Sequence, residues 1–342
     1  MEEMLWPLLV SFSLGVLFTP LTIKFAKQIH LLDDPKKHRH PAIIHHKPVP
    51  RGGGIPLLLS IVFTSIIFLP TDRIVMALLL GGILAVVVGV LDDKFDLSPY
   101  LRFATNIIVA ALPVFLGGIK ISFVTNPFGG ILHFNSFPMI PELLTVVWIV
   151  WTMNMLNWSK GVDGQMPGTA AIAALTIGIL SLRFYPLTLE NLTTAKLSFI
   201  TAGAALGFLL FNIHPARIFP GYGATILGYL LAITSVLGGA KLATAILVMG
   251  IPTIDGVFTI ARRLAAGRSP FKGDRGHFHH LLLSRGFGQR TVAFLYWVFS
   301  AILGVIALNL SSKEKFFAIL ALVIVVGGAI LWLSSLEKEQ KT

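Results

Sequence analysis

Cysteine is absent from the 342-residue sequence, and charged residues make up only 13% of it. Without cysteine the chain can form neither disulfide bonds nor thiolate metal sites. Charge this sparse is unusual for a soluble protein, and it accompanies 55% hydrophobic residues and a mean hydropathy of +0.81. Together these values predict an integral membrane protein of the all-α polytopic class.

Acidic residues are also few, since 16 Asp and Glu stand against 27 Lys and Arg. A basic excess is typical of nucleic-acid-binding proteins, but in a polytopic membrane protein it more often marks cytoplasmic loops. We therefore expect the lipid bilayer, and no nucleic acid, as a partner of this protein.

Eleven apolar runs are long enough to cross roughly 30 Å of hydrocarbon. They cover residues 4–26, 55–70, 74–91, 101–119, 139–157, 167–184, 195–213, 224–239, 240–260, 291–310 and 315–335. The sequence shows no internal repeat and no low-complexity linker. We predict a single helical domain over residues 1–342 with about 11 transmembrane helices.

The distribution of basic residues predicts the orientation. Alternate connections, with the residues that flank them, carry 20 Lys and Arg on one side and 7 on the other. The positive-inside rule then puts the N-terminus outside and the C-terminus in the cytoplasm. The loops predicted to be cytoplasmic are 27–54, 92–102, 155–167, 212–222 and 261–290. On the outer side, ISFVTNPFGGILHF predicts a small β-hairpin near 119–135, because it alternates around Asn-Pro and Gly-Gly turn residues.

The stretch 252–286 holds the densest ionisable chemistry of the sequence. Its candidates for ligand contact are Asp255, Arg275, His277, His279 and His280. Polar groups this dense between membrane spans are costly unless they face solvent or a ligand. Their cationic surplus favours an anionic ligand. Zinc is disfavoured, because His277 and His280 are three residues apart with no third aligned ligand.

The first two cytoplasmic loops offer basic and acidic candidates. Lys47 and Arg51 lie in KPVPRGGG, whose glycines allow the main chain to approach a ligand closely. The same residues are consistent with a loop that only meets lipid headgroups. Asp92 and Asp93 end an apolar helix, where the helix dipole and their mutual repulsion favour a catalytic base. Ordinary polar residues at the end of a span remain the alternative.

The third loop combines amide, basic and acidic side chains. Asn154 and Asn157 are about one helical turn apart, and Lys160 and Asp163 follow. Two carboxamides on one helix face can recognise the amide groups of a base or a sugar. An alternative stays open, because Asn in a membrane helix often bridges neighbouring helices. In the fourth loop, we interpret His214, which precedes a proline, as the end of a helix.

Five motifs taken together resemble one membrane enzyme family. They are KPVPRGGG, LDD at a helix end, NxxNxxxGxDG, the Gly-rich run after HPARIF, and PTIDGVFTIARRL followed by GRSPFKGDRGHFHHLLLSRGF. Over roughly residues 30–290 the chain is similar to the polyprenyl-phosphate N-acetylhexosamine-1-phosphate transferases.

The resemblance implies a reaction and a location. An N-acetylhexosamine 1-phosphate, with N-acetylglucosamine 1-phosphate the first candidate, would pass from a UDP-sugar to undecaprenyl phosphate, with release of UMP. This step would initiate a cell-envelope polysaccharide. The family likeness also implies a Mg²⁺ cofactor and a bacterial plasma membrane protein whose active site faces the cytoplasm.

The resemblance also implies roles for individual residues. Asp92, Asp93 and Asp163 would be catalytic and would hold the metal, with Asp92 the better candidate for the base. The implied substrate-binding residues are Lys47, Arg51, Asn154, Asn157, Lys160, Asp255, Arg275, His277, His279 and His280.

Two positions depart from the family pattern. Lys160 stands where the family usually has an Asp, and Tyr222 stands where it has an Asp that binds Mg²⁺. Two carboxylates with Mg²⁺ have a formal charge of zero, whereas Lys160 with Tyr222 has +1. We therefore hypothesise that Lys160 partly replaces the metal by neutralising the diphosphate.

Two alternatives to an active transferase remain, and the oligomeric state is a separate question. A catalytically silent relative would bind nucleotide sugar or polyprenyl phosphate without turnover. A transporter or channel is the weaker alternative, because the ionisable residues gather at one membrane face. A homodimer through residues 315–335 also stays open, because Gly327 and Gly328 would allow close helix packing.

Overall fold

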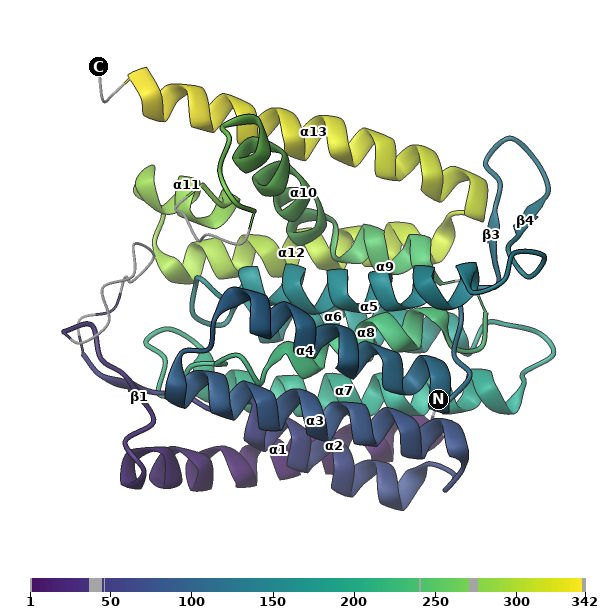
Figure 1. Cartoon of the computed structure of the whole chain (residues 1–342), viewed down its shortest axis with the longest axis horizontal. Coiled ribbons are helices and arrows are strands. Elements are labelled where there is room, and N and C mark those ends of the chain that lie inside the picture. The colour runs from purple at the N-terminus through teal and green to yellow at the C-terminus, as the bar shows by residue number, and fades with distance from the viewer. Residues whose placement is uncertain (1, 37–44, 46, 240, 271–275, 340–342) are drawn as a thin grey trace.

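The structure is a computed structural model that describes residues 2–36, 45, 47–239, 241–270 and 276–339. Helices dominate it (Figure 1). The helices are α1 Glu2–Gln28, α2 Gly54–Phe68, α3 Arg73–Phe95, α4 Pro99–Ala111 with its π-helical extension η1 Leu112–Leu116, α5 Ile140–Trp158, α6 Gln165–Ser181, α7 Leu189–Asn212, α8 Thr225–Val236, α9 Leu242–Val248, α10 Gly250–Ala265, α11 Phe278–Ser284, α12 Gln289–Asn309 and α13 Ser312–Glu339.

Each predicted apolar run contains helix, but their lengths differ. Six helices among the described residues, α1, α3, α4 with η1, α7, α12 and α13, are long and apolar enough to cross a membrane. The helices α2, α6 and α8 are apolar but shorter. The protein is therefore a multi-pass membrane protein, while the predicted number of 11 crossings remains a prediction.

The run 240–260 is not the single straight helix that its hydropathy predicts. It consists of α9 and α10, which meet at Met249 and differ in direction by 84°. Pro252 lies in the first turn of α10, where a missing backbone N–H costs no helical hydrogen bond. A hydropathy profile cannot reveal this bend, because the residues on both sides of it are apolar.

The interior of the bundle is formed around α7 and α8. All residues of α8 are buried, and α7 packs along α1, α2 and α6. Small residues make the α1–α7 contact possible, because a Cβ on Gly203 or Gly207 would collide with the backbone of α1. In Figure 1, α1 and α2 lie on one side of the bundle and α13 on the opposite side, with α10 running obliquely beneath α13.

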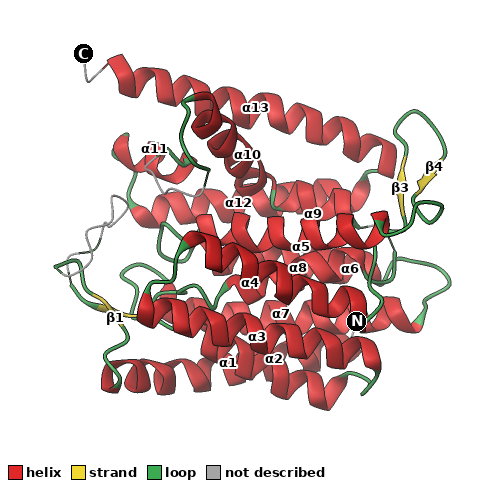
Figure 2. Ribbon diagram, in the orientation of Figure 1, coloured by secondary structure: helices red, strands yellow, loops and turns green. Residues whose placement is uncertain are grey.

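Two short antiparallel strand pairs lie at opposite ends of the bundle (Figure 2). β1 Leu32–Asp33 pairs with β2 Val49–Pro50 within the first predicted cytoplasmic loop. β3 Phe123–Thr125 pairs with β4 Ile131–His133 inside the range predicted for a hairpin. That this hairpin is external remains a prediction, as does the orientation of the whole chain.

Candidate active site

The five loops predicted to be cytoplasmic meet at the end of the bundle that carries β1 (Figure 1). The first and fourth loops are joined by backbone hydrogen bonds. Gly53 N donates to the carbonyl of Phe219 at 3.2 Å, and Phe219 N donates to the carbonyl of Pro50 at 2.8 Å. The fifth loop contacts the fourth, because Nε of Arg290 donates to the carbonyl of His214 at 2.9 Å.

Glycines allow the fourth loop to enter between α2 and α3. A Cβ on Gly54 or on Gly89 would collide with the backbone of Gly223. Gly221 has a φ of +65°, a conformation that only glycine adopts readily, and any Cβ there would meet the carboxylate of Asp93. The loop therefore lies directly against the acidic end of α3.

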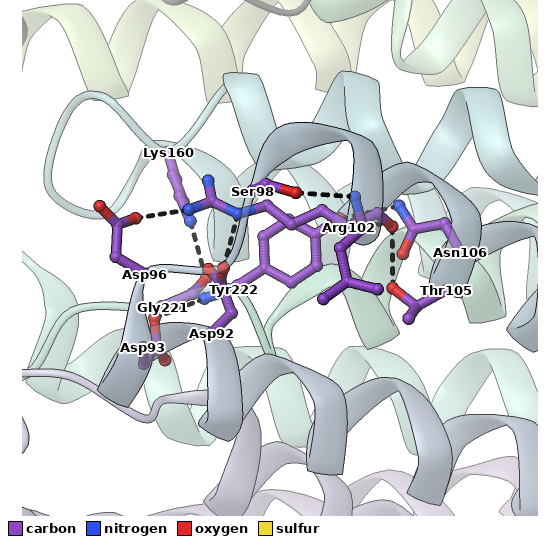
Figure 3. Close-up of polar contacts among 11 residues, drawn as sticks. Asp92, Asp93, Asp96, Ser98, Arg102, Thr105, Asn106, Lys160, Gly221 and Tyr222 are labelled. Carbon is purple, nitrogen blue, oxygen red and sulfur yellow. Dashed lines mark hydrogen bonds and ion pairs between the residues drawn. The ribbon is translucent and has the colours of Figure 1, made fainter.

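The two neighbouring aspartates at this end of α3 have different partners. Asp92 is buried and forms an ion pair with Nε of Arg102, whose Nη2 donates to Asp96 at 2.6 Å (Figure 3). Asp93 accepts a hydrogen bond from Tyr222 N through Oδ1 at 2.9 Å. Its Oδ2 is shielded from solvent and has no hydrogen-bond partner among the described residues. One carboxylate oxygen of Asp93 is thus buried without a hydrogen bond.

Lys160 reaches the same cluster from the third loop. Its Nζ donates to the carbonyl of Gly221 at 3.0 Å and lies 5.8 Å from the centre of the Tyr222 ring. Burial lowers the pKa of Lys160 to about 8, although the nearby Asp93 and Asp92 oppose the shift. The ammonium therefore remains largely protonated at pH 7.

The ring of Tyr222 lies within cation–π range of both cations. Cζ of Arg102 lies 5.6 Å from the centre of its ring, and Nδ2 of Asn106 donates to its hydroxyl at 3.0 Å. Burial raises the pKa of Tyr222 to about 12, so its phenol stays neutral at physiological pH. We call Asp92, Asp93, Arg102, Lys160 and Tyr222 the cation–carboxylate cluster.

Asp163 is held by the fourth loop. Its Oδ2 lies 2.8 Å from Nδ1 of His214 and accepts a hydrogen bond from Ala216 N at 3.1 Å. The next residue, Gly164, donates its N–H to Oδ1 of Asn212 at 3.0 Å. These contacts fix the third loop to the fourth, so His214 does more than end a helix.

The histidines of the fifth loop pack against the third loop. Asp255 on α10 accepts from Phe278 N at 2.9 Å and lies 2.9 Å from Nδ1 of His277. The rings of His277 and His279 are stacked at 5.6 Å, and His279 lies against Gly161. Burial, reinforced by its two histidine neighbours, holds the pKa of His279 well below its usual range. His279 is therefore a neutral side chain at pH 7.

Comparison with known proteins identifies the family. The model of glycosyl transferase family 4 matches residues 75–239. A decaprenyl-phosphate N-acetylglucosaminephosphotransferase of Mycobacterium tuberculosis is 31% identical over 80% of this chain and 74% of its own length. The chain belongs to glycosyl transferase family 4. The resemblance found in the sequence is thereby confirmed.

Two further relatives of family 4 align with nearly the whole chain. A probable undecaprenyl-phosphate N-acetylglucosaminyl 1-phosphate transferase of Bacillus subtilis is 29% identical over 93% of this chain and 88% of its own length. An undecaprenyl-phosphate alpha-N-acetylglucosaminyl 1-phosphate transferase of Thermotoga maritima is 29% identical over 94% of this chain and 93% of its own length.

The remaining predicted site residues have varied surroundings. Lys47 is exposed, whereas Arg51 donates to Asp33 at 2.8 Å. Nδ2 of Asn154 bonds to the carbonyl of Val150 in its own helix at 2.8 Å. Oδ1 of Asn157 is buried without a partner among the described residues. His280 is buried, and Arg275 lies outside the described residues.

Sequence reasoning gave no role to Arg102 or Asn106. A local signal for Arg102 exists, because Ser98 caps α4 by accepting from Leu101 N at 3.3 Å, and Pro99 follows it. This start places Arg102 in the first turn of α4, close to the end of α3. Its ion pair with Asp92 depends on how the two helices pack, which the motif alone does not give.

The predicted Mg²⁺ ligands do not form one site. No three Asp, Glu or His side chains in the described part of the chain come together in a way that could hold a metal ion. Asp92 is engaged by Arg102, and Asp163 is engaged by His214. Oδ2 of Asp93 has no hydrogen-bond partner among the described residues, but Lys160 lies close by as the cation that most opposes the desolvation of this carboxylate. The donor set therefore does not fit the divalent metal that the family pattern implies.

Proposed function

We propose that this family 4 enzyme transfers N-acetylglucosamine 1-phosphate from its UDP-sugar to a polyprenyl phosphate and releases UMP. The activities for which the family relatives are named give the reaction class. The supporting structural observation is that the second, third and fourth loops form the cation–carboxylate cluster, with the first and fifth loops packed against them. The cluster lies at one end of a membrane-embedded bundle, where a lipid phosphate and a water-soluble sugar nucleotide can meet.

The reaction joins the lipid phosphate to the sugar-bearing phosphorus. An oxygen of the polyprenyl phosphate attacks the β-phosphorus of the UDP-sugar and forms a new P–O bond. The bond between this phosphorus and the bridging oxygen breaks, and UMP leaves with that oxygen. Such transfers need little covalent help, so positioning and charge neutralisation supply most of the acceleration.

The contacts favour Asp93 over Asp92 as the base. Asp92 is neutralised by its ion pair with Arg102, whereas Asp93 keeps Oδ2 free of partners among the described residues. Asp93 would accept the proton of a singly protonated lipid phosphate and so increase its nucleophilicity. This assignment revises the preference for Asp92 that the motif suggests.

The third and fifth loops would hold the donor. Asn157 presents an unpaired amide oxygen that suits the N–H of a base or of an acetamido group. Asp163 would act by fixing the third loop to His214, as a positioning residue. Asp255 fixes the imidazole of His277, which stacks on His279. His279, as an uncharged imidazole, would donate a hydrogen bond to the diphosphate.

The membrane setting follows from the same proposal. The cluster would face the cytoplasm of a bacterial cell, where UDP-sugars are made, and the lipid-linked product would start an envelope polysaccharide. The single domain 1–342 would carry the whole activity.

A transfer assay tests the reaction. Purified protein would be incubated with radiolabelled UDP-N-acetylglucosamine and undecaprenyl phosphate, and UMP and labelled lipid would be measured. We expect equal amounts of both products, and their loss in Asp93→Asn. Lys160 and Tyr222 stand where the family has Asp residues, and this difference favours one alternative. In that alternative the protein binds nucleotide sugar or polyprenyl phosphate without turnover. Binding without UMP release from any UDP-N-acetylhexosamine would establish that alternative.

A further inference from the structure

The cation–carboxylate cluster has a charge balance that resembles that of an occupied metal site. Asp92 and Asp93 contribute two negative charges, and Arg102 and Lys160 contribute two positive charges. Two carboxylates with one divalent cation would have the same sum. Figure 3 shows the two cationic groups close together on the same side of the acidic end of α3, and the ring of Tyr222 is within about 6 Å of both.

The side chain at the position of the family's metal ligand is unsuited to binding a cation. The neutral phenol of Tyr222 is already bonded to Asn106, and its backbone N–H donates to Asp93. Its ring is in cation–π range of Lys160 and Arg102, which are 5.8 and 5.6 Å from the ring centre. A divalent ion placed here would meet the positive charges of Lys160 and Arg102, and Asp92 is already paired with Arg102.

We propose that Lys160 and Arg102 take the place of a divalent metal ion and bind the diphosphate of the donor directly. The inference rests on the proposed function, because that function brings a diphosphate to this cluster. Lys160 is suited to the role, because an ammonium has three N–H donors and only one is used by Gly221 among the described contacts. Neither cation changes its covalent bonds during the transfer.

Binding measured without turnover tests the proposal. Calorimetric titration of the purified protein with UDP-N-acetylglucosamine would be done in chelator and again with added Mg²⁺. We expect the same affinity in both, within about twofold. Lys160→Met removes a charge-assisted hydrogen bond and should weaken binding by about 10- to 100-fold. Lys160→Arg keeps the charge and should retain most of the affinity.

A matched lysine controls for nonspecific effects of charge. Lys120 lies next to the β3–β4 hairpin, at the opposite end of the bundle, and pairs with Glu142 at 3.3 Å. Lys120→Met should bind UDP-N-acetylglucosamine as the unsubstituted protein does. Folding of every variant would be checked by thermal unfolding, so that loss of binding is not confused with loss of structure.

A spectroscopic experiment reports on metal binding itself. Mn²⁺ added to the unsubstituted protein should show no saturable binding by electron paramagnetic resonance. The double variant Lys160→Asp with Tyr222→Asp should acquire a Mn²⁺ site, because it adds two carboxylates beside Asp93. Stoichiometric Mn²⁺ binding by the unsubstituted protein that is lost in Asp93→Asn would overturn the proposal.

The combined results separate this inference from the function on which it rests. Transfer that persists in chelator supports both the metal-free binding of the diphosphate and the proposed transferase function. Transfer or donor binding that disappears in chelator and returns with Mg²⁺ overturns the inference and leaves the function intact. Metal-free donor binding that depends on Lys160, without release of UMP, supports the inference and contradicts the function.

Discussion

The charge of Lys160 sets a pH limit for donor binding. Its pKa of about 8 results from burial, opposed by Asp93 and Asp92, while Arg51 and Arg102 lower it further. Lys160 therefore loses its proton as the pH rises through about 8, and we expect the affinity for UDP-N-acetylglucosamine to fall between pH 7 and pH 9. Lys160→Arg should bind almost equally across that range, because guanidinium stays protonated. A parallel decline in both proteins would contradict this explanation.

The buried His279 predicts a loss of stability in acid. Its pKa is well below 6.5 in the folded protein and about 6.5 in the unfolded chain. The unfolded state therefore binds a proton that the folded state does not, and stability falls as the pH drops below about 6.5. The slope contributed is about 1.4 kcal/mol per pH unit. Thermal unfolding should show a smaller acid dependence in His279→Gln, and an unchanged one in His133→Gln on the exposed hairpin.

Neighbouring carboxylates show what a motif does not reveal about individual residues. The sequence predicted that Asp92 and Asp93 are important together, but it favoured Asp92 as the base. Consecutive residues on a helix point about 100° apart. Which of the two meets Arg102 therefore depends on the rotation of α3 against α4, and this rotation is a property of the packed bundle.

At the scale of elements, the entry of the fourth loop depends on close backbone contact. Gly89 on α3 leaves no room for a Cβ, because the backbone of Gly223 occupies that space. Gly89→Ala should destabilise the protein by about 1–3 kcal/mol, as overpacking does, and should also reduce transfer. Gly328→Ala on α13 is the matched control, since open space surrounds it and alanine favours helix. Equal melting temperatures for Gly89→Ala and the unsubstituted protein would contradict the contact.

The elements themselves were largely predictable, because long apolar runs in a membrane protein must form helices. All the predicted runs contain helix in the described residues. The bend between α9 and α10 was missed, as was the pairing of Leu32 with Pro50. Both depend on tertiary contacts. The same holds for the contact of Asp163 with His214, which joins residues 51 positions apart.

At the scale of the whole molecule, the predicted orientation can be tested with single cysteines, because the chain has none of its own. Ala266 and Ser136 are exposed, the first in the fifth loop and the second beside the hairpin. In intact cells, a membrane-impermeant maleimide should label Ser136→Cys but not Ala266→Cys. Permeabilised cells should be labelled at both positions. The reverse pattern would invert the topology and place the cluster outside the cell.

Packing across the whole chain also bears on self-association. Gly327 lies against the ring of Phe258 of the same chain, whereas Gly328 faces open space. One of the two glycines is thus already used within the chain. A dimer through α13 remains a prediction, and of the two glycines Gly328 is the one exposed to a partner.

The position of the fourth loop has a consequence for how the catalytic end is assembled. Residues between α7 and α8 contact the first, second and third loops and Arg290, so no early segment of the chain can complete the cluster alone. During synthesis, Tyr222, whose backbone N–H donates to Asp93, is added 129 residues after that aspartate. Tyr185, in the connection between α6 and α7, is almost fully exposed. Two fragments divided there would each be inert, and activity would return only when they associate in the same membrane.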